Sequence, residues 1–160
     1  MSSTLKIKPI CAAVASTLGP KRPGELHIAV VSDIHLGHAR NRATEIVKNL
    51  YIAFPDNAET ASLDIIFLAG DVFDDLFSMN NDELLEIELW IAYMLRLCKK
   101  HDIVLRILEG TPSHDWKQSC RFTTMNQAAA IGTDLKHVKD LSIEYIERYG
   151  ITVLYVPDEW

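Results

Sequence analysis

Four short apolar segments, separated by longer stretches of helical character, constrain the fold of this 160-residue chain most strongly. Each segment is rich in branched residues and almost continuously apolar, as expected for strands that are covered on both faces. The segments are residues 26–31, 64–69, 103–108 and 151–156. Strands that alternate with helices form βαβ units, so the sequence predicts an α/β fold with a mainly parallel sheet and flanking helices.

Helical periodicity predicts the elements between these strands. We expect helices over residues 40–54 and 80–100, and a third helical region over about 119–131 and 135–148 that ends before Gly150. Residues 1–24 contain several prolines and glycines and are expected to form an arm, so the domain proper spans residues 25–160.

The composition restricts the function classes and the compartment. The net charge of −6 and the pI of about 5.4 argue against a broad basic surface that binds nucleic acid by charge alone. Three scattered cysteines form no disulfide or metal-binding framework, which favours a reducing, cytoplasmic environment. No segment approaches the roughly 20 apolar residues that a membrane span needs, so no membrane association is expected.

Carboxylates and imidazoles follow three of the four predicted strands. The three sets are Asp33 and His35, Asp71 and Asp74, and His114 and Asp115. The carboxyl ends of parallel strands meet at one edge of a sheet, so these side chains are expected to lie together there. Each set alone also has a plainer interpretation as a turn, a helix cap or a surface loop. Together they predict a site for a divalent metal ion such as manganese, zinc or iron.

The three motifs, DIH, GDVFD and GTPSHD, resemble those of the calcineurin-like metallophosphoesterases, whose pattern is DxH, GDxxD, GNHD or GNHE, and finally GHxH. The chain is most similar to the branch of DNA-repair exonuclease subunits, and especially to virus-encoded relatives. The resemblance covers residues 26–160. It implies that the chain forms half of a four-layer αββα sandwich whose site holds two divalent ions, with manganese the first choice.

The resemblance also implies roles for individual residues. Asp33 and His35 would bind the first ion, and Asp71 would bridge two ions roughly 3.5–4 Å apart. His114 would contact the phosphate and help to protonate the leaving oxygen, with Asp115 orienting its ring. Asp74 would orient a ligand or cap a helix.

Two departures from the pattern affect the second ion. Ser113 stands where the related proteins have an asparagine ligand, in a loop that is two residues longer. After Asp115 the only histidine is His137, which is expected on the surface of a helix and outside any GHxH motif. The second ion would therefore keep Asp71 and Ser113 alone, so we expect this chain by itself to hold at most one ion well.

Three further residues are candidates for substrate binding. His38 lies just beyond the DxH motif, where it could contact a phosphate or simply be solvated. Trp116 and Lys117 follow the HD pair and could bind a nucleic-acid strand by stacking and charge, although a structural tryptophan is an equal alternative.

Two functions stay open on these grounds. The chain is a metal-dependent phosphodiester hydrolase of the DNA exonuclease type, or it is an inactive, truncated relative that binds and regulates a complete exonuclease or its partner. The second sheet implied by the resemblance is absent from the sequence. We therefore expect an exposed apolar sheet face, covered by another copy of the chain or by a second polypeptide. A virus-encoded protein would act in the host cytoplasm.

Overall fold

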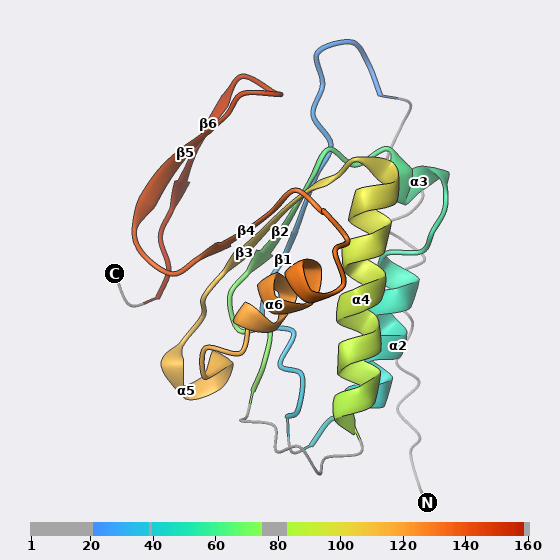
Figure 1. The fold of residues 1–160 in the computed structure, drawn as a ribbon, viewed down its shortest axis with the longest axis vertical. Coiled ribbons are helices and arrows are strands. Elements are labelled where there is room, and N and C mark those ends of the chain that lie inside the picture. The colour runs from blue at the N-terminus through green and yellow to red at the C-terminus, as the bar shows by residue number, and fades with distance from the viewer. Residues whose placement is uncertain (1–20, 39, 75–82, 159–160) are drawn as a thin grey trace, which may run out of the picture.

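The computed structural model describes residues 21–38, 40–74 and 83–158, and its centre is a parallel sheet of four strands (Figure 1). The strands are β1 (Ile28–Val31), β2 (Ile65–Ala69), β3 (Val104–Leu108) and β4 (Leu135–Val138). They lie side by side in the order in which they occur in the chain. This arrangement confirms the predicted α/β class and the first three predicted strands.

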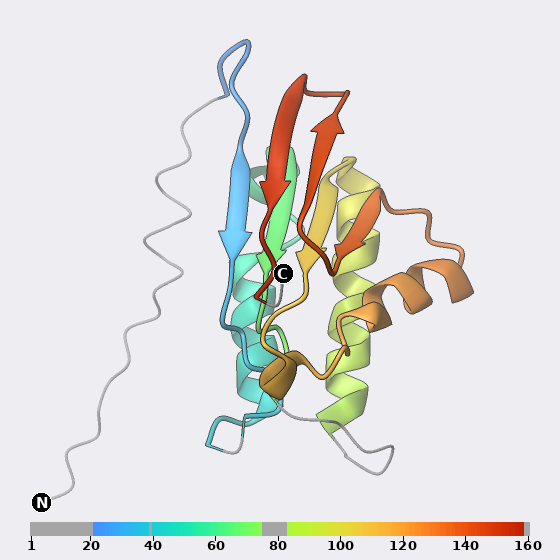
Figure 2. The same cartoon turned by 90° about the vertical axis from the view of Figure 1, so that its left-hand side faces the viewer.

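The longer helices cover one face of this sheet (Figures 1 and 2). They are α2 (Ala43–Ala53), α4 (Glu83–His101) and α6 (Cys120–Ala128), and two single turns, α3 (Ala58–Ala61) and α5 (Pro112–Asp115), lie in the connections. Acidic residues in the first turn of α4 and basic residues in its last turn favour the helix dipole. Residues 80–82, where this helix was expected to begin, and residues 1–20 of the arm predicted over 1–24 lie outside the described part.

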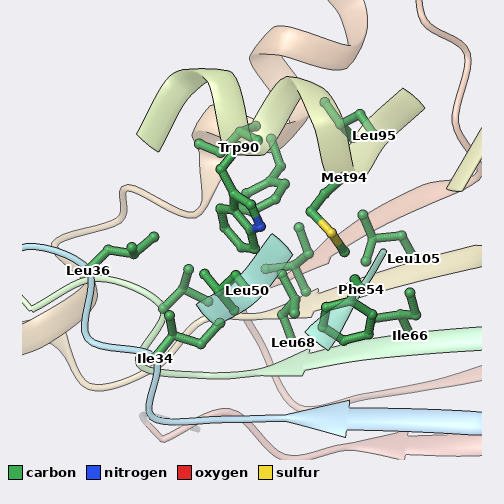
Figure 3. Packing of buried hydrophobic residues seen from close by; sticks show 14 of the residues in the cluster. Ile34, Leu36, Leu50, Phe54, Ile66, Leu68, Trp90, Met94, Leu95 and Leu105 are labelled. Atoms are coloured by element: carbon green, nitrogen blue, oxygen red, sulfur yellow. The ribbon is translucent and has the colours of Figure 1, made fainter. Parts of the chain in front are cut away.

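The main core lies between α2, α4 and the sheet. Figure 3 shows Trp90 and Met94 directed from α4 toward the strands, with Leu95 beside them on the same helix. All three are fully buried, as are Ile66, Leu68 and Leu105 of the strands they face. At about 25 cal/mol per Å² of apolar surface, this burial is the main stabilising contribution to the fold.

An antiparallel hairpin covers the opposite face of the sheet. It consists of β5 (Ser142–Ile146) and β6 (Ile151–Tyr155), which form a separate two-stranded sheet. Figure 2 shows the hairpin on the side of the strands away from α2 and α4. The helix predicted over residues 135–148 is therefore wrong, because this segment forms β4 and β5. The strand predicted at residues 151–156 is present, but it pairs with β5 and not with the parallel sheet.

Polar contacts around Arg106 attach the hairpin to the sheet. Arg106 lies on β3 with 5% of its surface exposed and donates two hydrogen bonds, of 3.0 and 2.9 Å, to the carboxylate of Glu144 on β5. The Tyr155 hydroxyl donates to the same carboxylate at 2.6 Å. A second, smaller apolar cluster around Ile65, Val104 and Ile146 completes this contact.

The hairpin changes where apolar surface is exposed. The sheet face over β2 and β3 was expected to be open to water, but the hairpin's inner side covers it. Several exposed apolar side chains lie instead on the outer side of the hairpin and on the edge strand β1. Among them are Ile143, Tyr145 and Leu154, with 69%, 60% and 61% of their surface exposed, and Val30 with 65%. Within the described residues, no helix is long and apolar enough to cross a membrane.

Candidate metal centre

The segments that follow β1 and β2 remain paired beyond the ends of these strands. The backbone N–H of His35 donates to the carbonyl of Asp71 at 3.0 Å, and that of Leu36 donates to Val72 at 2.9 Å. The N–H of Asp74 then donates back to the carbonyl of Leu36 at 2.9 Å. These bonds hold the side chains of the first two motifs next to each other at the carboxyl edge of the sheet.

The loop after β3 is fastened to the same edge. Both the backbone N–H and the hydroxyl of Thr111 donate to Oδ1 of Asp71, at 2.8 and 2.9 Å. The buried carboxylate of Asp115 accepts from the N–H of Phe73 at 2.9 Å and from that of Gly110 at 2.6 Å. The third motif is thus held against the second by three hydrogen bonds, and the bond between Gly110 and Asp115 closes the third motif on itself.

Gly110 is needed for this close approach. A Cβ atom at this position would lie 2.1 Å from the backbone nitrogen of Asp71 and 2.3 Å from its Oδ1. The nitrogen belongs to the backbone of the loop that carries Asp71, and Oδ1 is held by its two hydrogen bonds from Thr111. Any side chain at residue 110 would therefore push the second and third motifs apart.

Unusual backbone conformations gather in these loops. Seven non-glycine residues of the described part have positive φ, and five of them belong to the three loops. These five are Asp33, His35, Asp71, Trp116 and Lys117, with φ between 47° and 59°. Left-handed conformations of non-glycine residues are costly and persist where the surroundings impose them, which is common at functional sites.

Two groups of side chains have donor atoms close enough to hold a metal ion. One consists of Asp33, His35 and Asp71, and the other of His35, Asp74 and His114. Within each group the donor atoms lie within 4.8 Å of one another. Carboxylate oxygens and imidazole nitrogens are ligands for hard or borderline divalent ions. The predicted ligands Asp33, His35 and Asp71 are thus brought together.

Asp74 joins the two histidines. Its Oδ1 lies 2.8 Å from Nδ1 of His35 and 2.6 Å from Nδ1 of His114. Burial opposes ionisation of Asp74, but the hydrogen bonds from His114 and His35 outweigh it and lower the pKa of this carboxyl. An ionised carboxylate has no hydrogen to donate, so both protons lie on Nδ1. The Nε2 atom of His35 is then the one available to a metal.

The charge state of His114 follows from the same contact. The hydrogen bond to Asp74 raises the pKa of His114, and the negative charges of Asp71 and Asp115 act in the same sense. A histidine with a raised pKa carries its second proton, on Nε2, at a higher pH than usual. His114 is therefore suited to donate a proton to a ligand beside the metal group.

The remaining predicted site residues divide into those at the centre and those away from it. The ring of His38 lies at the centre, with Nε2 4.0 Å from Oδ2 of Asp74. Trp116 is half exposed just beyond α5. Ser113 is exposed on α5, and its hydroxyl makes no hydrogen bond to any residue in the described ranges.

Two contacts differ from expectation. Asp74, and not Asp115, is the hydrogen-bond partner of the His114 ring, because the carboxylate of Asp115 is engaged by the backbone of Phe73 and Gly110. His137 lies on β4 and not on a helix surface. Its side chain is 6% exposed, and its Nε2 lies 2.5 Å from the carboxylate of Glu109.

Sequence reasoning missed Thr111, which holds Asp71 through two hydrogen bonds, and the double role of Asp74. A signal existed for Asp74, because it is the second aspartate of the GDVFD motif, three residues after Asp71. No comparable signal marks Thr111. Comparison of the chain with protein-family models, curated proteins and solved structures finds no match to any of them. Function is therefore inferred from the chemistry of the described residues.

Proposed function

We propose that this chain carries the metal-binding half of a metal-dependent phosphodiester hydrolase, a metallophosphoesterase of the nuclease type. One observation carries the proposal: Asp33, His35, Asp71 and His114 converge from three loops at the carboxyl edge of three adjacent parallel strands. A hydrolase needs a metal group and a proton donor side by side, and this edge offers both.

The group of Asp33, His35 and Asp71 fits one divalent ion. Asp74 supports it from outside by fixing the ring of His35, as hydrogen-bonded carboxylates commonly do for metal-bound histidines. A bound divalent ion polarises a phosphate and makes water a better nucleophile near neutral pH. Manganese is our first choice and zinc or iron the alternatives, because the donors are oxygen and imidazole nitrogen.

The protein's own contribution would be positioning and proton transfer. His114, held through Nδ1 by Asp74, would donate its Nε2 proton to the oxygen that leaves the phosphorus. His38, at the same edge, would contact a non-bridging phosphate oxygen. Ser113 belongs to neither group of candidate ligands, so at the place that the resemblance gives to a second ion Asp71 would be the only ligand.

The test is a titration of the protein with manganese, followed by hydrolysis of bis-p-nitrophenyl phosphate. We expect saturable binding of one ion and metal-dependent hydrolysis. Both should be lost in Asp71→Asn, whereas His114→Gln should keep the binding and lose the hydrolysis. Glu45→Gln is the matched control, because Glu45 is an exposed acidic residue on α2. The absence of saturable manganese binding in the folded protein would contradict the proposal.

A second candidate function is supported by the incomplete ligand set. An inactive relative that binds and regulates a complete exonuclease, or its partner, needs no second ion and no substrate. The apolar outer side of the hairpin, around Ile143, Tyr145 and Leu154, offers a surface for such a contact. Tight binding of manganese without any diester hydrolysis, together with association with another polypeptide, would favour this candidate over the enzyme.

A further inference from the structure

A pocket of about 300 Å³ lies beside the candidate metal centre. Its walls come from the ends of β3 and β4, from the loop that leads to His114, and from the segment after β6. The lining residues are Glu109, Gly110, Pro112, Lys117, Lys139, Asp140 and Pro157. The pocket shares Gly110 and Pro112 with the loop of the third motif. A group bound in it would therefore be a near neighbour of one bound at His114.

Two lysines that line this pocket are available to bind an anion. Neither Lys117 nor Lys139 forms an ion pair with any residue of the described part. The carboxylate of Glu109 is engaged by His137 at 2.5 Å. Asp140 also borders the pocket, so the two carboxylates balance the two lysines in formal charge, and an anion would be held by direct contact with the lysine ammonium groups and not by net charge.

The backbone fixes one of these lysines. Lys117 has φ 59°, and the preceding Trp116 has φ 47°, so two consecutive non-glycine residues are left-handed. Directly after them, the N–H of Gln118 donates to the carbonyl of Asp115 at 2.7 Å and closes this turn. The turn that follows His114 thus holds Lys117 at the pocket instead of leaving it on an extended loop.

We propose that this pocket binds a second phosphate of the substrate, next to the phosphodiester that is cleaved. The inference rests on the proposed function and narrows its substrate class to a nucleotide chain, in which phosphates repeat along the backbone. Lys117 and Lys139 would contact this second phosphate through charge-assisted hydrogen bonds. Simple diesters with a single phosphate would leave the pocket unused.

The test compares two dinucleotides that differ by one phosphate. The metal-free protein is titrated with pTpT and with TpT at low ionic strength, and dissociation constants are taken from amide shifts in two-dimensional NMR spectra. We expect pTpT to bind about fivefold more tightly or better, with shifts at Gly110 and Lys139. Inorganic phosphate is titrated in parallel. If it binds as tightly as pTpT, the pocket is a site for free phosphate and the proposal is overturned.

Variants test whether the preference for pTpT over TpT arises from this pocket. Lys139→Gln, and separately Lys117→Asn, should reduce the preference for pTpT to about twofold or less. Asparagine suits residue 117 because it tolerates a left-handed backbone. Lys48→Gln removes an exposed lysine of α2 and should keep the full preference. Equal binding of pTpT and TpT by the unmodified chain, or an unchanged preference in Lys139→Gln, would overturn the proposal.

The two proposals fail in different ways. Loss of the proposed function would appear as no manganese binding and no hydrolysis of bis-p-nitrophenyl phosphate by the unmodified protein, whatever the dinucleotides do. Loss of the pocket proposal would appear as equal affinity for pTpT and TpT, even in a protein that hydrolyses the aryl diester.

Discussion

Nδ1 of His114 lies 2.6 Å from Oδ1 of Asp74, and the same oxygen lies 2.8 Å from Nδ1 of His35. One carboxylate oxygen therefore orients a candidate metal ligand and a candidate proton donor together. Rotation of the Asp74 side chain would disturb both rings. The metal group and the proton donor are thus coupled through a residue that need not touch substrate.

We predict that Asp74→Asn lowers the pKa of His114. The amide carries no charge, so it removes the hydrogen bond to a carboxylate that raises this pKa. The pKa can be followed through imidazole resonances in an NMR titration of the metal-free protein. Asp33→Asn is the control and should change the pKa of His114 far less, because the main causes of its shift are Asp74, Asp71 and Asp115. An unaltered pKa in Asp74→Asn would contradict the assigned contact.

Gly110→Ala should destabilise the protein by about 3 kcal/mol, because overpacking here cannot relax without moving the backbone of Asp71. The free energy of unfolding in urea measures this effect. Gly24→Ala is the comparison, since a Cβ at residue 24 would meet nothing within 4 Å and only its φ of 84° opposes a side chain. Equal losses in the two variants would mean that the crowding at Gly110 is relieved.

Acid should weaken the attachment of the hairpin through Glu144. Burial opposes ionisation of this carboxyl, but the hydrogen bonds from Arg106 and Tyr155 outweigh burial and lower its pKa below the ordinary 4.5. A carboxyl whose pKa is lowered on folding adds stability above its unfolded pKa, and this stability is lost as the pH falls through the folded value. The unmodified chain should therefore lose stability below about pH 4.5.

Glu144→Gln tests this linkage. At neutral pH the variant should be about 2 kcal/mol less stable, because Arg106 keeps only its bonds to Asp134 and the backbone. Between about pH 5 and pH 3 its free energy of unfolding should fall less steeply than that of the unmodified chain. Glu45→Gln on α2 should keep the original slope. Parallel slopes in all three proteins would show that Glu144 does not carry the effect.

The outer side of the hairpin is predicted to mediate association. Ile143 and Leu154 are directly opposed across the two strands, and both are more than half exposed. The double variant Ile143→Lys, Leu154→Thr should shift the protein toward the monomer in size-exclusion chromatography with light scattering. The double variant Leu85→Lys, Leu89→Thr removes two exposed leucines of α4 and serves as the control. A monomeric unmodified chain at micromolar concentration would contradict this prediction.

Much of the sheet could be predicted from the sequence because its first three strands are nearly continuous apolar runs. The prediction of a helix over residues 135–148 was wrong, because the apolar residues of this segment fit a helical spacing as well as a strand spacing. Two features favoured strands: the alternation of Ile143, Glu144 and Tyr145, and the turn-forming Asp140 just before them. Arg106, a lone charge within an apolar strand, also indicated that something polar covers that face.

The site could be predicted in part for a similar reason. Residue types and their places after strands were enough to bring together Asp33, His35 and Asp71. The partner of His114 was not predictable, because Asp74 and Asp115 are equally plausible carboxylates until the path of the loops is known. That path depends on contacts such as the hydrogen bonds of Thr111 to Asp71, which no local pattern encodes.

The order β1-β2-β3-β4 has a consequence for synthesis of the protein. Each strand pairs with the one made just before it, so a chain emerging from the ribosome always offers the next strand a finished neighbour. Every side chain of the two metal groups has been made once His114 has emerged. The hairpin, with Glu144 and Tyr155, is made after these residues, so all the strands and loops that form the carboxyl edge can be in place before it covers Arg106.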